Sequence, residues 1–347
     1  MIPDSIFFRW SFRFKSMRKV FALLMLATLT LALTAFFAFI RWSEEPISLS
    51  QKTIFVLEHG QVFSEISAQL IEQSVEIDPM LFHLLAKYRG VDEGMRAGTY
   101  ELPLRISPSR LLEMFSEGEV KLYEFRINEG WSYRQLARHL RADEKIVYTL
   151  NGVSKKTILE RLDIEYSYLE GVFFPDTYFF ESGTEDLEIL SRASETMKQK
   201  VSAIWKSANP DRYKLGSSSD MLVLASLIEK ETGRDQDRFL ISQVFQERLR
   251  KKMRLQTDPS VIFALGDEFD GNLTRKNLRI DSPYNTYLKR GLPPTPISYP
   301  SEASLLAAAN PANSEYLYFV ARGDGSSQFS KTLREHNAAV RKYQLKR

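Results

Sequence analysis

The chain of 347 residues contains no cysteine. It therefore cannot form a disulfide, use a thiolate as a nucleophile or bind zinc through sulfur. Histidine is scarce as well, and the four that occur form no His-Glu-x-x-His motif. They are His59, His83, His139 and His336. A Gly-x-Ser-x-Gly elbow, a Walker loop and a dinucleotide fingerprint are also missing. The chemistry that remains is that of carboxylates, and we expect neither a metal nor a cofactor.

Basic and acidic residues occur in nearly equal numbers. Lysine and arginine number 47 against 44 aspartate and glutamate, which gives a formal net charge of +3. Such a small bias does not indicate a nucleic-acid partner. The length leaves room for one membrane element and two folded units with a real core.

One long segment has no charge, glycine or proline, and it runs from Val20 to Ile40. As a helix it would extend roughly 31 Å, enough to cross a hydrocarbon core of about 30 Å. A cleaved signal peptide is the alternative, but its apolar region is usually about 7–15 residues, so we favour an uncleaved anchor. Five basic residues precede the segment: Arg9, Arg13, Lys15, Arg18 and Lys19. The positive-inside rule then predicts a cytoplasmic N-terminus and the rest of the chain outside.

The sequence of residues 52–118 predicts a small α+β module. Thr53 to Leu57 is typical of a strand, and Val62 to Gln73 has helical spacing. A second helix is expected from Asp78-Pro79, as N-cap and first residue, to Tyr88, with Gly90 closing it. A second strand is expected over 98–102. The predicted order is strand, helix, helix, strand.

The remaining chain predicts a larger α+β domain. Ser132 with Gln135 forms a capping-box pattern, and 184–205 has the pattern of a long amphipathic helix. The aromatic-rich stretch 169–178 is interpreted as a buried loop that supports a groove, with a packed turn as an equal alternative. A hairpin is expected near 316–329. The predicted division is a basic cytoplasmic segment (1–19), a transmembrane helix (20–40), a linker (41–51), the small module (52–118) and the larger domain (119–347).

The stretch from Met221 to Tyr299 holds the best candidate for a site. It begins with a mostly apolar helix that ends in Glu229, Lys230 and Glu231. Both glutamates would touch apolar neighbours, so periodicity does not choose between them, and such a pattern is most often simply a solvated helix end. The sequence downstream is rich in Pro, Gly, Asn, Thr and Tyr, a composition typical of a shaped polar groove.

From about Met221 to Tyr343 the chain closely resembles the endolytic murein transglycosylase family, also called YceG-like. The blocks that carry the resemblance are Leu224-Ala-Ser-Leu-Ile-Glu-Lys-Glu-Thr232, Arg254-Leu-Gln-Thr-Asp-Pro-Ser260, Tyr284-Asn-Thr-Tyr287, Gly291-Leu-Pro-Pro294, Ala308-Ala-Asn-Pro311, Tyr316-Leu-Tyr-Phe-Val320 and His336-Asn337. Asn128-Glu-Gly130, Glu170-Gly171 and Phe174-Pro-Asp-Thr-Tyr178 extend it upstream. The resemblance covers nearly the whole chain, and it implies that the small module is LysM-like.

The family's catalytic glutamate falls on Glu229. The implied reaction is non-hydrolytic cleavage of the β-1,4 bond between N-acetylmuramic acid and N-acetylglucosamine, with a 1,6-anhydro ring as product. Glu229 would act first as acid and then as base, and the apolar helix around it would help to keep it protonated. The candidates for holding the sugars are Gln256, Asp258, Ser260, Tyr284, Asn285 and Thr286, each with loop scaffolding as an equal alternative. Asp258 could instead cap a helix that starts at Pro259.

The resemblance further implies a single-pass protein of the bacterial inner membrane whose catalytic domain is periplasmic. Its expected partners are peptidoglycan glycan strands, the membrane through residues 20–40 and the penicillin-binding synthases. One rival is a muramidase that adds water, with Asp258 or Glu231 as its second carboxylate. Another is a non-catalytic peptidoglycan-binding scaffold.

Overall fold

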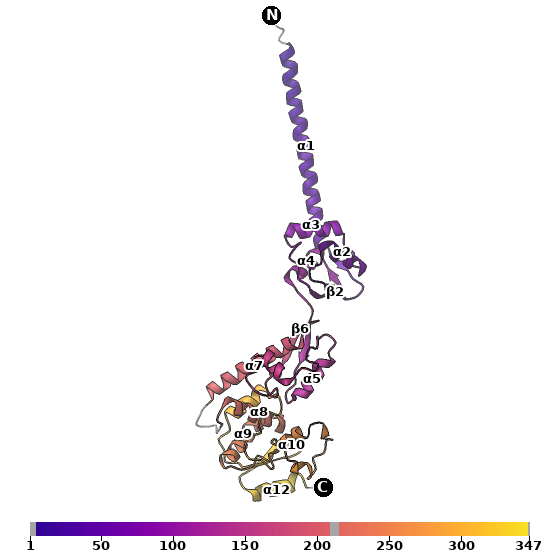
Figure 1. Ribbon diagram of the computed structural model, residues 1–347. Coiled ribbons are helices and arrows are strands. Elements are labelled where there is room, and N and C mark those ends of the chain that lie inside the picture. The colour runs from indigo at the N-terminus through magenta and orange to yellow at the C-terminus, as the bar shows by residue number, and fades with distance from the viewer. Residues whose placement is uncertain (1–4, 209–214, 346–347) are drawn as a thin grey trace. The chain divides into compact units, whose positions relative to one another are not determined.

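The computed structural model describes residues 5–208 and 215–345, with side chains from Met17 onward. It divides into two compact units, Met1–Leu122 and Tyr123–Arg347. Figure 1 shows the elements of both. The fold is mixed helix and strand, as predicted, and four separate two-stranded sheets occur among the described residues. The first four residues of the predicted basic segment 1–19 lie outside the described residues.

Helix α1 (Ser5–Glu44) contains the predicted membrane segment and is longer than it at both ends. Among the described residues it is the one helix that is long and apolar enough to cross a membrane, and its apolar window is not buried by protein. The helix continues into the segment predicted as linker. There Trp42 packs against the core of the first unit, and Ser43 is buried.

The small module has the predicted order of elements. Strand β2 (Thr53–Leu57) pairs antiparallel with β3 (Gly98–Leu102), and helices α2 (Phe63–Glu72) and α3 (Pro79–Arg89) lie between them in the chain. Helix α3 begins and ends as expected, because the Asp78 carboxylate accepts from two backbone N–H groups and Gly90 has a left-handed φ of 69°. The other elements are β1 (Ile47–Ser48), β4 (Arg105–Ile106) and α4 (Pro108–Glu117). Buried Phe55, Phe82, Tyr100 and Phe115 form the centre of its core.

The second unit begins with a two-stranded sheet and three helices. They are β5 (Leu122–Arg126), α5 (Tyr133–Ala142), α6 (Lys155–Arg161), β6 (Thr177–Glu181) and α7 (Asp186–Ser207). The capping box predicted at the start of α5 is present. The stretch 169–174 is a buried loop, as expected, but the end of the predicted loop is the start of strand β6. The aromatic residues here alternate between buried and exposed along that strand.

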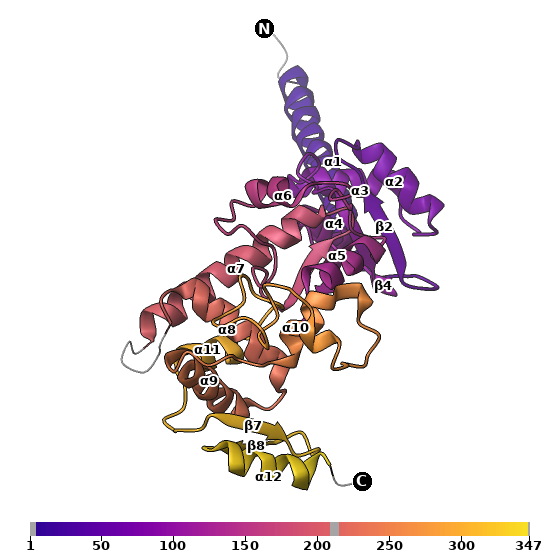
Figure 2. The same ribbon diagram turned by 60° about the horizontal axis from the view of Figure 1, so that its bottom comes forward.

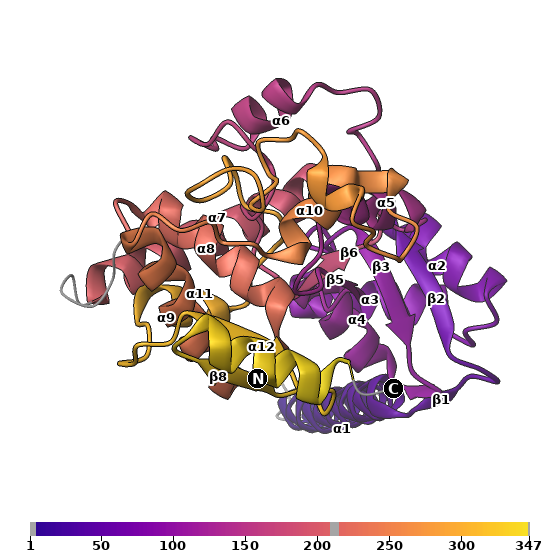
Figure 3. The ribbon, with the colours of Figure 1, turned by 90° about the horizontal axis from the view of Figure 1, so that it is seen from below.

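A three-helix core follows, made of α8 (Ser218–Glu231), α9 (Asp235–Arg250) and α11 (Glu302–Ala309). Figure 2 shows these helices packed together. All eight residues from Met221 to Ile228 are buried, as a helix surrounded by others requires. The remaining elements are α10 (Asp258–Leu265), η1 (Gly266–Glu268), η2 (Asn277–Arg279), β7 (Tyr318–Ala321), β8 (Ser327–Ser330) and α12 (Leu333–Tyr343). Figure 3 shows α12 lying along the β7–β8 hairpin, which the sequence predicted.

The close contact between Gly171, in the buried loop 169–174, and Pro296 can be tested by substitution. The φ of Gly171 is +75°, and a Cβ there would lie 2.5 Å from Cβ of Pro296. Gly183 has a φ of +90° with nothing within 4 Å of such a Cβ. We expect Gly171→Ala to lower the free energy of unfolding by about 1–3 kcal/mol more than Gly183→Ala, because only the first adds a collision to the backbone strain. Denaturant unfolding of the two variants checks this, and equal losses would contradict it.

Candidate functional site

The Glu229 carboxylate lies at the end of α8, where one of its oxygens accepts four hydrogen bonds. Oε2 accepts from the Ser301 backbone N–H at 2.9 Å and from its hydroxyl at 2.5 Å. It also accepts from the Ser304 hydroxyl at 2.7 Å and from Nη1 of Arg238 at 3.1 Å. The ion pair is buried, with side-chain exposures of 6% for Glu229 and 5% for Arg238. A buried charge pair needs such added hydrogen bonds to offset its desolvation.

The other oxygen, Oε1, is in a different situation. No hydrogen bond from a described residue reaches it. The buried side-chain polar atoms without a partner among the described residues are Gln73 Oε1 and His336 Nδ1, so Glu229 Oε1 retains contact with solvent. The carboxylate is therefore fixed through Oε2, and Oε1, which accepts no hydrogen bond from a described residue, is the oxygen left to exchange a proton with a ligand.

Two elements, α9 and α11 with its N-cap, supply the donors to Oε2. Ser301 is the N-cap of α11, and its hydroxyl also accepts from the Ser304 N–H at 3.3 Å. Glu229 thus lies at the positive end of that helix. Arg238, on α9, reaches both Glu229 and the Ser304 hydroxyl, the latter at 2.6 Å. The sequence led us to expect apolar surroundings for this carboxyl group, and this was wrong: the helix behind it is apolar, but the carboxylate itself meets polar donors.

The segment from Ile297 to Ser301 joins this site to a distant loop. On one side, the Ile297 N–H donates to the Ser226 hydroxyl at 3.0 Å, and the Ser298 hydroxyl donates to the Ser226 carbonyl at 3.1 Å. On the other side, the Tyr299 backbone exchanges hydrogen bonds with residues 130 and 131, both at 2.8 Å. The loop 128–131 is therefore held beside the end of α8.

Glu129, in that loop, is a carboxylate that the sequence reading did not single out. Partial desolvation and the negative charge of Glu229 raise the pKa of Glu129, and the charge of Arg238 opposes this. Its neighbour Gly130 lies so close that a Cβ there would be 3.9 Å from Cγ of Glu229. Lys230 Nζ donates to the Gly130 carbonyl at 3.1 Å. The motif Asn128-Glu-Gly130 was recognised, but its proximity to Glu229 depends on a tertiary contact.

Glu231 points to a different neighbour. The Thr257 hydroxyl donates to Oε1 of Glu231. Burial raises the pKa of Glu231 to about 7, and the charge of Asp258 acts in the same direction. The Thr257 hydrogen bond and the charge of Arg248 oppose this rise. The two glutamates that periodicity could not separate therefore have distinct environments.

Three of the predicted sugar-holding residues are buried: Ser260, Asn285 and Thr286. The Ser260 and Thr286 hydroxyl oxygens lie 2.8 Å apart, and the Asn285 side-chain amide donates to the carbonyls of residues 278 and 280. These contacts hold the loop 254–260 against the loop 278–287. All three therefore make the loop-to-loop contacts expected of scaffolding, which was their alternative.

The other three have at least partly accessible side chains. Gln256 and Asp258 are exposed, and Gln256 has a φ of 55°, which is uncommon outside glycine. Asp258 accepts from the Tyr287 hydroxyl at 2.5 Å and is the first residue of α10, after Thr257 as N-cap. Tyr284 is half-buried, and its hydroxyl lies 2.9 Å from that of Thr295.

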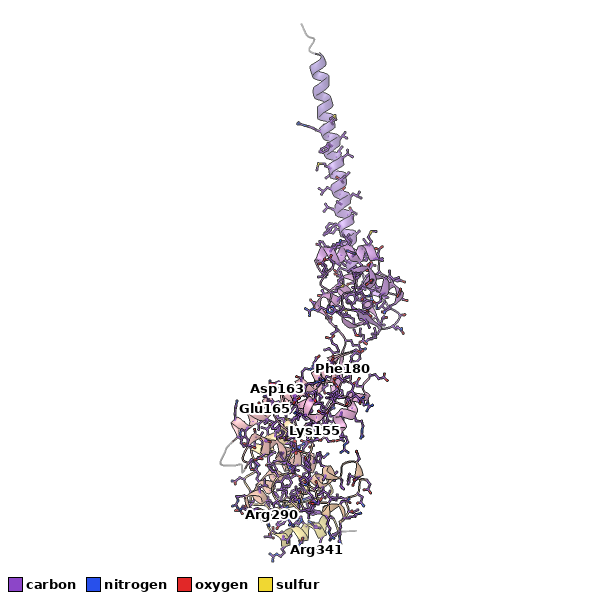
Figure 4. All side chains as sticks on the ribbon, in the orientation of Figure 1. Lys155, Asp163, Glu165, Phe180, Arg290 and Arg341 are labelled. Carbon is purple, nitrogen blue, oxygen red and sulfur yellow. The ribbon has the colours of Figure 1, made fainter. Side chains whose placement is uncertain are left out.

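Two cavities lie elsewhere in the second unit. One of about 740 Å³ is lined by residues 155–167, among them Lys155, Asp163 and Glu165 (Figure 4). A smaller one of about 270 Å³ lies between residues 162–166 and helix α7. Neither is lined by Glu229, so we place the candidate site by its hydrogen bonding rather than by cavity size. Within 5–208 and 215–345, no group of three or more His, Asp or Glu side chains is placed to hold a metal ion.

Comparisons with known proteins agree on one family. The model of the YceG-like family matches residues 55–342. An endolytic murein transglycosylase of Bacillus subtilis is 33% identical over 325 residues, which are 86% of this chain and 87% of that protein. One of Streptococcus pneumoniae is 28% identical, and the match covers 84% of this chain but 58% of that longer protein. A crystal structure of a putative yceG-like protein from Listeria monocytogenes matches with a TM-score of 0.54 and 30% identity, over 84% of this chain and 99% of that one.

The proximity of Glu129 to Glu229 can be tested by titration. We expect the pKa of Glu129, followed by NMR through its side-chain carboxyl carbon, to lie above the ordinary value and to fall in Glu229→Gln. The reason is that this substitution removes the negative charge that raises the pKa. Glu231→Gln is the control and should leave the pKa of Glu129 closer to that of the native protein. An unchanged pKa in Glu229→Gln would show that the two groups do not interact.

The raised pKa of Glu231 predicts how stability depends on pH. The folded state binds this proton more tightly than the unfolded state, so the free energy of unfolding should fall as pH rises from about 4.5 through about 7. We expect Glu231→Gln to remove about 1–3 kcal/mol of that fall. Unfolding measured at a series of pH values checks this, and parallel curves for both proteins would contradict it.

Proposed function

Because this chain belongs to the YceG-like family, we propose that it is an endolytic murein transglycosylase. It cleaves the β-1,4 bond between N-acetylmuramic acid and N-acetylglucosamine within nascent glycan strands. The product carries a 1,6-anhydro-muramic acid end, and the cut limits further elongation of the strand. The single observation that carries the proposal is the unequal environment of the two oxygens of Glu229.

This asymmetry suits a group that acts as acid and then as base. All four partners donate to Oε2, so the proton of the acid form belongs on Oε1, the oxygen that solvent reaches. Oε1 gives this proton to the glycosidic oxygen as the bond to C1 breaks. The carboxylate that results then takes the proton of the muramic acid 6-hydroxyl, whose oxygen bonds to C1 and closes the anhydro ring.

The donors around Oε2 stabilise the negative charge while it exists. Arg238, the Ser301 and Ser304 hydroxyls and the N-terminus of α11 are in place before the proton leaves, so little reorganisation is needed. We assign Arg238 and the two serines as positioning residues for Glu229.

The chemistry needs no second carboxylate, whereas glycoside hydrolases use two. The two residues proposed for that role in a muramidase are already engaged, since Glu231 accepts from Thr257 and Asp258 accepts from Tyr287. This favours the transglycosylase over the muramidase. The names of the matched relatives likewise favour an enzyme over a non-catalytic scaffold.

The glycan-binding residues divide into two groups. Gln256, Asp258 and Tyr284 have accessible side chains and are proposed to contact the sugars by hydrogen bonds and ring stacking. The buried Ser260, Asn285 and Thr286 shape the loops that carry the first group.

The first unit indicates the proposed location of the protein in the cell. Helix α1 anchors the chain in the bacterial inner membrane with the N-terminus in the cytoplasm, so the catalytic domain is periplasmic. The small βααβ module is LysM-like and contributes to peptidoglycan binding. Penicillin-binding synthases are the expected neighbours, because the proposed substrate is the strand that they extend.

The reaction can be tested with purified peptidoglycan and mass spectrometry. We expect the native protein to release fragments with 1,6-anhydro ends, and Glu229→Gln to lower their rate of formation by at least about 100-fold, since general acid–base catalysis is lost. Glu188→Gln is the matched control: it makes the same substitution at an exposed glutamate of α7 and should retain most activity.

Three outcomes would contradict the proposal. Reducing ends formed with added water would indicate a muramidase. Anhydro ends at the native rate from Glu229→Gln would show that another residue is the acid. Binding of glycan by the folded native protein without any cleavage would favour the scaffold.

A further inference from the structure

Helix α3 has an apolar stripe that the described part of the protein leaves largely exposed. Met80, Leu84 and Tyr88 follow one another at intervals of four residues, so they lie on one face. Their exposures are 80%, 53% and 61%. The opposite face of α3 carries Phe82 and Leu85, which are buried in the module core. The helix is therefore apolar on both faces, although one of them is largely exposed among the described residues.

The position of this stripe relative to α1 is set by ring contacts. The Tyr88 ring lies 6.2 Å from the ring of Phe36 and 6.4 Å from that of Phe39, measured between centroids. Phe36 belongs to the predicted membrane segment, and its four-residue distance from Ile40 corresponds to about 6 Å along the helix. Tyr88 is thus at the level of the last turn of that segment. Figure 1 shows α3 at the end of the module that α1 enters, with β2 toward the other end.

We infer that α3 lies in the lipid headgroup region of the membrane, with Met80, Leu84 and Tyr88 turned toward the acyl chains. This rests on the proposed anchoring role of α1. An interfacial helix buries its apolar face about 5–10 Å below the headgroups, which matches the level of Tyr88. Tyrosine is also a preferred residue at this depth, because its ring is apolar and its hydroxyl is polar.

The charges around the stripe agree with a lipid surface. Lys87 on α3 and Arg41 on α1 are both exposed. Both can reach lipid phosphates while their apolar stems follow the acyl boundary. Exposed Phe37 continues the apolar surface on α1. A lipid interface is thus the occupant for which this surface is suited, and it holds the module against the membrane by a second contact beyond the anchor.

The absence of cysteine allows a direct test, because a single introduced cysteine is labelled uniquely. The full chain is reconstituted in vesicles of phosphatidylcholine and phosphatidylglycerol that contain nitroxide lipids of shallow or deep position. A fluorophore is attached in separate variants at Leu84→Cys, at Leu29→Cys in the apolar segment and at Val56→Cys. Val56, on β2, is the control because it is apolar and 44% exposed, and Figure 1 shows β2 away from the end that α1 enters.

We expect shallow nitroxides to quench the Leu84→Cys label at least about twofold more than the Val56→Cys label, since an interfacial helix lies within their reach. The Leu29→Cys label should be quenched best by deep nitroxides. Quenching at Leu29→Cys with equal, weak quenching at Leu84→Cys and Val56→Cys would overturn the inference and leave the anchor intact. No quenching at Leu29→Cys would overturn the anchor and the inference together. A blue-shifted but unquenched label at Leu84→Cys would indicate contact with protein, such as a second copy, and would also overturn it.

Discussion

The convergence of four donors on one oxygen of Glu229 is the interaction on which the second unit depends. A carboxylate and a guanidinium that are both about 95% buried would destabilise the fold unless they were paired and hydrogen-bonded. The hydrogen bonds to Glu229 that meet this requirement hold α9 in place through Arg238 and the start of α11 through Ser301. The segment before Ser301 is fixed in turn, and with it the loop 128–131. The geometry of the candidate site and the packing of the three helices therefore depend on the same set of contacts.

Local signals in the sequence were sufficient for much of the fold. The capping residues Asp78 and Ser132 and the apolar spacing of α2 act within a few residues, so the elements that they define were predicted. The motif resemblance identified Glu229, the catalytic role of which stays a prediction. What could not be predicted depends on contacts between distant residues. Ser301 looks like an ordinary helix cap, and nothing local in α9 indicates that Arg238 reaches Glu229.

The roles that the sequence left open also depend on contacts between distant residues. Ser260, Asn285 and Thr286 are polar residues in a loop rich in turn formers, a composition that serves a ligand-binding surface and a hydrogen-bonded loop interior equally well. Only burial separates the two roles, and burial is decided by how the loops 254–260 and 278–287 pack. The apolar residues before Glu229 likewise indicated a buried helix correctly, but they carried no information on the donors at its end.

The residues of the candidate site are far apart in the sequence, and this separation decides how much of the chain must be made before the site can form. Glu229 meets its donors 72 and 75 residues later in the chain, at Ser301 and Ser304. A growing chain that has passed Glu229 but not reached these serines has the acid and Arg238 but lacks the serine donors. During export of the proposed periplasmic domain, the enzyme would thus emerge inactive and acquire its cutting activity only when nearly all of the chain has crossed. Its synthesis therefore delays any cleavage of the wall until the protein is complete.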